Sequence, residues 1–127
     1  MDMKLELVGV PVADADRAIE FYVRVGFVLD HDHAVSDEIR FVQMTPPGSA
    51  CSIAFGKGLT GLAPGSLDNL QVVVADAGVA HDDLAARGVD VSDVDEQPWG
   101  KFVYFSDPDG NRWSLQQLPE WSSGAGG

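Results

Sequence analysis

The feature that most constrains this sequence is an internal duplication at a spacing of 62 residues. The stretch VPVADADRA at 10–18 matches VVVADAGVA at 72–80, and with the same shift Gly26 falls on Gly88. The register is kept through a strand, a helix end and a turn, which indicates two copies of one supersecondary unit.

Each copy begins with a strand, followed by an aspartate that suits a helix N-cap, Asp14 or Asp76. Each helix ends near a glycine, Gly26 or Gly88. Three further strands follow in each copy. They are expected at about 27–33, 38–44 and 51–56, then at about 89–95, 101–106 and 112–118.

We therefore predict an α+β fold of two tandem βαβββ modules, at about residues 4–58 and 66–118, whose curved mixed sheets enclose a cleft. The first helix is expected to pack through one side. The residues on that side are Ala15, Ala18, Ile19, Tyr22 and Val23.

The composition fits one small globular domain. The chain has 127 residues, 45% of them apolar, so residues 1–121 are expected to form one domain, with 122–127 as a flexible tail. The 20 acidic and 8 basic side chains give a net charge of −12, which argues against nucleic-acid and membrane partners. With one cysteine and no apparent signal or membrane-spanning segment, a cytoplasmic location is expected.

Three stretches carry a family resemblance: VPVADADRAIEFYVRVGF, VVVADAGVAHDDLAARGV and FSDPDGNRWSLQQ. They resemble the vicinal oxygen chelate superfamily, which includes glyoxalase I, bleomycin-resistance proteins and extradiol dioxygenases. The resemblance covers nearly all of residues 4–118 and implies a paired-module fold and a homodimer.

In metal-dependent members of this superfamily, four ligands come from the first and last strands of the two modules. The resemblance places them at Leu7, Asn69, Ser52 and Ser114, with Ala54 as the alternative to Ser52. Leucine and alanine have no donor atom, and serine and asparagine are poor ligands for first-row metals. No metal and no cofactor is therefore expected.

Strand alternation predicts which residues share the cleft side of those positions. The second module contributes neutral polar groups and the first a small, mostly apolar wall, an arrangement suited to an organic ligand. The predicted ligand-contacting residues are Leu7, Ser52, Asn69, Gln71, Tyr104, Ser114 and Gln116. The alternative is that the amides satisfy one another or water in a filled interior. Pattern alone leaves open whether Phe41 or Val42, and Phe102 or Tyr104, face inward.

The segment LDHDHAVSDEI at 29–39 carries two histidines flanked by carboxylates. Alternation places His31 and His33 on one face of a strand, as a metal chelate would need. That strand lies away from the four usual positions, so a relocated metal site ranks last among the hypotheses.

The first-ranked hypothesis is a small-molecule-binding protein that sequesters a natural product or toxic metabolite. The alternative is a metal-independent lyase, isomerase or cyclase acting on a small carbonyl compound. The expected partners are a small organic ligand and a second copy of the chain. The sequence leaves turnover open, and no catalytic residue is assigned.

Overall fold

The structure, a computed structural model, describes residues 1–120, so Trp121 and the predicted tail at 122–127 lie outside the described residues. The chain divides into two units. The first unit is Met1–Leu67 with Asp107–Asn111, and the second is Asp68–Ser106 with the residues from Arg112 onward.

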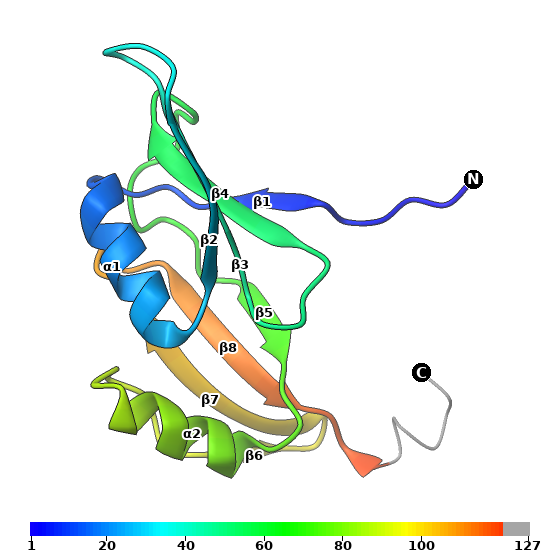
Figure 1. Cartoon of the computed structure of the whole chain (residues 1–127). Coiled ribbons are helices and arrows are strands. Elements are labelled where there is room, and N and C mark those ends of the chain that lie inside the picture. Colours follow the sequence, from blue (N-terminus) through cyan, green and yellow to red (C-terminus); the bar gives the residue numbers. More distant parts are fainter. Residues whose placement is uncertain (121–127) are drawn as a thin grey trace. The chain divides into compact units, whose positions relative to one another are not determined.

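The order of elements is βαβββ twice, which confirms the predicted fold class. The elements are β1 (Leu7–Gly9), α1 (Ala15–Val25), β2 (Val28–Ala34), β3 (Arg40–Thr45), β4 (Ser52–Lys57), β5 (Leu70–Val73), α2 (Ala77–Ala86), β6 (Asp95–Gln97), β7 (Gly100–Ser106) and β8 (Arg112–Gln117) (Figure 1).

Each unit holds a mixed sheet of four strands. The strand orders are β1-β4-β3-β2 and β5-β8-β7-β6, with the first pair of each sheet parallel and the others antiparallel. One helix lies against each sheet, α1 on the first and α2 on the second (Figure 1). The other face of each sheet, opposite its helix, is called its open face below.

Helix α1 begins and ends as the sequence predicts. The Asp14 side chain accepts the Arg17 N–H at 3.2 Å, and Gly26 adopts φ 116° at the C-cap. The helix packs through Ala15, Ala18 and Tyr22, which are buried. The prediction for Val23 was wrong, because this side chain is 51% exposed. One residue further along the helix turns it about 100° away from the side that Tyr22 buries.

Helix α2 shares this design, with Asp76 accepting the Val79 N–H at 3.0 Å and Ala77 and Leu84 buried. The strand predicted at 89–95 is shorter and later than expected, since β6 covers only Asp95–Gln97. Before it, the Ser92 hydroxyl accepts the Tyr104 N–H at 2.9 Å. A side chain there replaces the backbone carbonyl that a regular ladder would supply.

The turn SDPDGN at 106–111 is built around one aspartate. Oδ1 of Asp107 accepts the N–H groups of Asp109, Gly110 and Asn111 at 2.9–3.0 Å. Residues 107–111 belong to the first unit, where Asn111 Nδ2 donates to the Pro11 carbonyl at 2.8 Å. The second copy of the repeat thus supplies one turn to the unit that is otherwise built from the first.

The repeat does not hold its spacing through the first strands. Val10 N–H bonds to the Ala54 carbonyl and Val74 N–H to the Gln116 carbonyl, at 2.8 and 2.9 Å. The acceptors are 62 residues apart, like the two helix caps, but the donors are 64 apart. The connection from strand to helix is therefore two residues longer in the first module than in the second.

Candidate functional site

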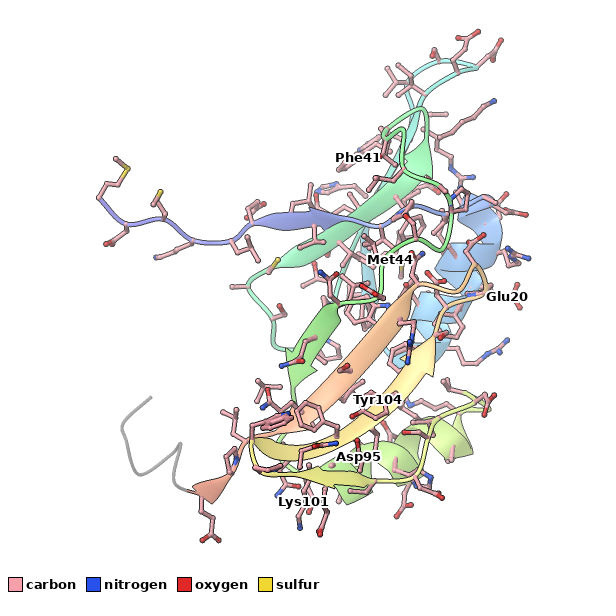
Figure 2. All side chains as sticks on the ribbon, turned by 180° about the vertical axis from the view of Figure 1, so that it is seen from behind. Glu20, Phe41, Met44, Asp95, Lys101 and Tyr104 are labelled. Atoms are coloured by element: carbon pink, nitrogen blue, oxygen red, sulfur yellow. The ribbon has the colours of Figure 1, made fainter. Side chains whose placement is uncertain are left out.

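The open face of the first sheet is lined by alternate residues of its strands. Leu7 pairs with Ser52, Gly9 with Ala54, and Gln43 with Ala54, so these side chains point to one side. The residues between them, such as Val42 and Phe55, are buried toward α1, where Phe55 stacks on Tyr22 at 5.8 Å. Phe41 therefore belongs to the open face and Val42 to the core, which settles the choice left open by the sequence (Figure 2).

A pocket of about 780 Å³ lies in this unit. It is bordered by the open face, by the connection from β1 to α1, and by the segment that follows β4. Its lining residues are Leu7, Gly9, Val10, Val12, Ala13, Asp14, Ala15, Arg40, Phe41, Ala54, Phe55, Gly56, Lys57, Gly58, Leu59, Thr60, Leu62 and Pro64. The volume falls in the range of about 300–1,000 Å³ typical of small-molecule sites.

Two of the charged side chains at the pocket, Arg40 and Lys57, donate hydrogen bonds within the protein. The Arg40 guanidinium lies 2.9 Å from carboxylates of both Asp16 and Asp32. The hydrogen bonds with Asp32 and Asp16 raise the pKa of Arg40, and the bond from Arg40 lowers the pKa of Asp32. Lys57 Nζ donates to the Asp37 carbonyl at 2.7 Å. Arg40 is therefore neutralised by two carboxylates, whereas Lys57 bonds to an uncharged carbonyl and Asp14 caps α1.

The two predicted residues of the first module lie differently with respect to the pocket. Leu7 lines it, as does Ala54. Ser52 is on the same face but is buried, and its hydroxyl lies 2.7 Å from Thr45 Oγ1. Thr45 also donates to the Asp30 carboxylate. Ser52 is thus engaged in a chain of side-chain hydrogen bonds beside the pocket.

His31 and His33 lie on the outermost strand of the first sheet. His31 pairs with Gln43 and His33 with Phe41, and the two imidazole rings stack with centroids 5.8 Å apart. A β-bulge between Leu29 and His31 sets this register. Both histidines share one face of β2, as alternation predicts, and the pairing shows that it is the open face. Within residues 1–120, no three side chains of histidine, cysteine, aspartate or glutamate are grouped to hold a metal ion.

The open face of the second sheet is polar. Gln71 pairs with Ser114, and Tyr104 pairs with Ser114 from the other side. Gln71 Nε2 donates to Gln116 Oε1 at 2.8 Å, and Gln116 Nε2 donates to the Trp99 carbonyl at 2.8 Å. Four of the predicted residues, Gln71, Ser114, Gln116 and Tyr104, therefore share one face. The amides of Gln71 and Gln116 bond to each other, and that of Gln116 also bonds to the backbone.

Tyr104 is held by a carboxylate on the neighbouring strand. Its hydroxyl donates to Asp95 Oδ2 at 2.7 Å, and Gln97 Nε2 donates to the same oxygen at 2.9 Å (Figure 2). The bonds from Gln97 and Tyr104 lower the pKa of Asp95, and the bond to Asp95 raises the pKa of Tyr104. Phe102 stacks on Tyr104 at 6.1 Å, so both aromatic rings share the open face.

Asn69 is the predicted site residue that the strand pairing leaves out. It is exposed and precedes β5. Leu7 pairs with Ser52 and Gln71 with Ser114, so the counterpart of Leu7 in the second module is Gln71 rather than Asn69. This follows from the longer connection in the first module. The four positions then hold Leu7, Ser52, Gln71 and Ser114, of which leucine has no donor atom and serine is a poor ligand. One glutamine with a leucine and two serines does not fit a first-row metal.

Sequence reasoning missed the segment after β4 as part of the pocket. Leu59 and Leu62, in the stretch GKGLTGLAPG at 56–65, line it. The available signal was the presence of two leucines in a glycine-rich connection, because such connections are usually polar.

Residues 4–115 match the model of the Glyoxalase/Bleomycin resistance protein/Dioxygenase superfamily. Among solved structures, the chain is similar to TnmS3, an antibiotic binding protein from Streptomyces sp. CB03234. The identity is 35% and the TM-score 0.83, over 93% of this chain and 98% of that one.

A glyoxalase/bleomycin resistance protein from the same Streptomyces is 36% identical with a TM-score of 0.78, over 90% of this chain and all (100%) of that one. The chain is also 24% identical to the uncharacterized protein YetH of Bacillus subtilis (strain 168), over 92% of this chain and 100% of YetH.

Proposed function

Because the chain belongs to the Glyoxalase/Bleomycin resistance protein/Dioxygenase superfamily, we propose that it is a small-molecule-binding protein that sequesters a natural product or toxic metabolite without the superfamily's usual metal. The observation that carries the proposal is the pocket of about 780 Å³ on the open face of the first sheet. The similarity to an antibiotic binding protein supports the same conclusion.

The ligand class follows from the pocket wall. Leu7, Phe41 and Ala54 supply apolar surface, while Arg40 is compensated by two carboxylates. A charged ligand group placed against this wall would lose hydration without gaining an unpaired partner. The part of the ligand that enters the pocket is therefore uncharged and apolar or aromatic. The net charge of −12 favours molecules that carry a positive charge elsewhere.

The test is titration with Nile red, an uncharged aromatic dye whose fluorescence rises in apolar surroundings. The wild-type protein is expected to bind it at one site per chain, and aromatic antibiotics are expected to displace it. Gly9→Phe is the blocking variant, because a Cβ at Gly9 meets nothing within 4 Å and the ring can fill the pocket. Its matched control is Val73→Phe, which adds the same ring at an exposed position of β5.

The outcome separates pocket binding from non-specific adsorption. The proposal expects Gly9→Phe to weaken dye binding at least about tenfold, a loss of roughly 1.4 kcal/mol, with Val73→Phe unchanged. Equal binding by both variants and the wild-type protein would contradict it.

Binding is favoured over the alternative of a metal-independent lyase, isomerase or cyclase. Such an enzyme needs a general acid or base with a pKa near the working pH. The Tyr104–Asp95 bond raises the pKa of the phenol and lowers that of the carboxyl, so both move away from neutrality. This pair is therefore unsuited to proton transfer. Incubation with small carbonyl compounds, followed by mass spectrometry, is expected to return them unchanged.

We further propose a homodimer that works in the cytoplasm. Apolar side chains at Met3, Leu5 and Val28 are exposed, and β2 presents an unpaired outer edge. A second copy would cover such surface, and light scattering would report twice the mass of 13.5 kDa. Within residues 1–120 no helix is long and apolar enough to cross a membrane.

A further inference from the structure

The segment at residues 59–64, called the lid segment below, connects the end of β4 to the approach to β5 and forms one side of the pocket. Leu59 and Leu62 line the pocket yet are 41% and 55% exposed. A leucine that is half in water and half on a pocket wall gains burial when an apolar ligand fills the space beneath it. These two side chains are therefore placed to cover a ligand.

Both flanks of the lid segment are fixed in place. Gly58 has φ 72°, and a Cβ there would lie 2.5 Å from the Glu38 carbonyl oxygen. Gly65 has φ 78°, and a Cβ there would lie 1.9 Å from the Asp109 carbonyl oxygen. Gly65 N–H also donates to the Pro11 carbonyl at 3.1 Å. Glycine is required at both flanks, because a side chain would collide with neighbouring backbone.

The stretch between the flanks is held much less firmly. In the described part of the chain, the hydrogen bonds of residues 59–64 are local: Leu62 N–H to Thr60 Oγ1 at 3.1 Å, and Ser66 N–H to the Ala63 carbonyl at 3.2 Å. None of these bonds reaches a strand or a helix. A Cβ added at Gly61, in the middle, would meet nothing within 4 Å. A segment that makes few hydrogen bonds to the rest of the protein and has half-exposed side chains is expected to have low local stability.

The floor beneath the lid segment is shaped to receive it. Leu59 Cδ1 lies 3.3 Å from where a Cβ of Gly56 would be, so the missing side chain on β4 makes room for this leucine. Leu59 therefore rests on the sheet next to the space that Phe41 and Ala54 border.

We propose that the lid segment opens and closes over the pocket between fixed ends, and that Leu59 and Leu62 determine how long an apolar ligand stays bound. This inference rests on the proposed binding function, since it assigns a role to residues of the same pocket. The closed position is the one in which both leucines contact the ligand. Opening needs only the local bonds within the segment to rearrange, whereas the flanking glycines stay in place.

The experiment is stopped-flow dissociation of Nile red from the wild-type protein and from Leu59→Ser and Leu62→Ser. The matched control is Leu118→Ser, because Leu118 is 42% exposed and lies outside the lining of this pocket. Each lid variant is expected to raise the dissociation rate constant about five- to tenfold and to change the association rate constant less. The control is expected to match the wild-type protein. Thermal midpoints measured in parallel show that all variants are folded.

A second measurement tests the motion itself. Hydrogen exchange of the backbone amides of residues 59–63 is expected to be fast in the free protein and slower with Nile red bound. If the dye binds and Gly9→Phe blocks it, but both lid variants release it at the control rate, the lid proposal is wrong. Exchange that is unchanged by bound dye would also overturn it. If the wild-type protein does not bind the dye, the proposed function itself fails.

Discussion

The hydroxyl of Tyr22 donates a hydrogen bond of 2.8 Å to Asp107 Oδ2, joining the buried face of α1 to the turn at 107–111. The two residues are 85 positions apart in the sequence. The other oxygen of Asp107 accepts three backbone N–H groups of the same turn. One carboxylate thus shapes the turn and fixes it to a helix of the first unit.

Replacing Tyr22 by phenylalanine is expected to lower the free energy of unfolding by about 1.5–3 kcal/mol. The ring still packs on Phe55, but the buried Asp107 Oδ2 loses one of its two donors and keeps Asn111 Nδ2. Urea denaturation followed by circular dichroism measures the change. Tyr104→Phe is the control, because its hydrogen bond is only partly buried, and a smaller loss is expected there. Equal losses of the free energy of unfolding in the two variants would contradict the prediction that the buried Tyr22–Asp107 bond stabilises the fold more than the Tyr104–Asp95 bond.

Substituting Gly65 by alanine is expected to destabilise the fold, by about 1–3 kcal/mol or more. The new Cβ would lie 1.9 Å from the Asp109 carbonyl oxygen and would need φ 78°, which alanine rarely adopts. Gly61→Ala is the matched control, since its Cβ would meet nothing within 4 Å. The thermal midpoint is expected to fall for Gly65→Ala and to stay within a few degrees for Gly61→Ala. The reverse order would show that the flanks of the lid segment are not fixed as described.

The sequence predicted the fold because its signals are local and occur twice. Asp14 and Asp76 cap the helices and Gly26 ends the first one, as expected from short-range backbone chemistry. The short length of β6 could not be predicted from the sequence. It depends on the Ser92 side chain, which accepts a hydrogen bond from the backbone of β7. The connection from strand to helix is two residues longer in the first module, and this could not be predicted either. Only the strand pairing shows which residues lie opposite each other.

The site was predicted less completely than the fold. Alternation placed Gln71, Ser114 and Gln116 on one face, because that rule needs only the strand assignment. It could not find Leu59 and Leu62, which follow no periodic pattern and reach the pocket through the path of a glycine-rich connection. The pocket in the first unit is likewise a consequence of side-chain size at Gly9 and Ala54, which only the assembled sheet reveals.

The charge of the protein is expected to act on the rate of association rather than on the residence time. Its net charge of −12 should attract cations over a distance that salt shortens to about 10 Å at 0.1 M. Arg40 at the pocket is already paired with two carboxylates of the protein. Raising salt from about 20 to about 150 mM should therefore slow association of a cationic dye such as crystal violet several-fold. Nile red, which is uncharged, is the control and should associate at an unchanged rate. A salt-dependent dissociation rate for crystal violet would contradict the expectation that the net charge acts on association alone.

Removing the carboxylate of Asp95 is expected to return the Tyr104 phenol toward its ordinary titration. The hydrogen bond to Asp95 raises the pKa of Tyr104 above its usual value of about 10, because ionising the phenol would break the bond and place two anions together. A group whose pKa is raised by folding stabilises the folded state below its unfolded pKa, and this contribution is lost as the pH rises through the folded pKa. For Tyr104 the loss therefore occurs above about pH 10. Asp95 has the opposite sign, since its lowered pKa gives a contribution that disappears only as the pH falls below about 4.

The measurement is a titration of tyrosinate absorbance at 295 nm in the wild-type protein, in Asp95→Asn and in Asp93→Asn. Asp93 is the control because it precedes β6 and its side chain does not accept the Tyr104 bond. Asp95→Asn should ionise Tyr104 at lower pH than the wild-type protein, whereas Asp93→Asn should follow the wild-type curve. Coincident curves for all three proteins would mean that the Tyr104–Asp95 bond does not hold the phenol in its protonated form. The pair would then no longer be excluded from proton transfer near neutral pH.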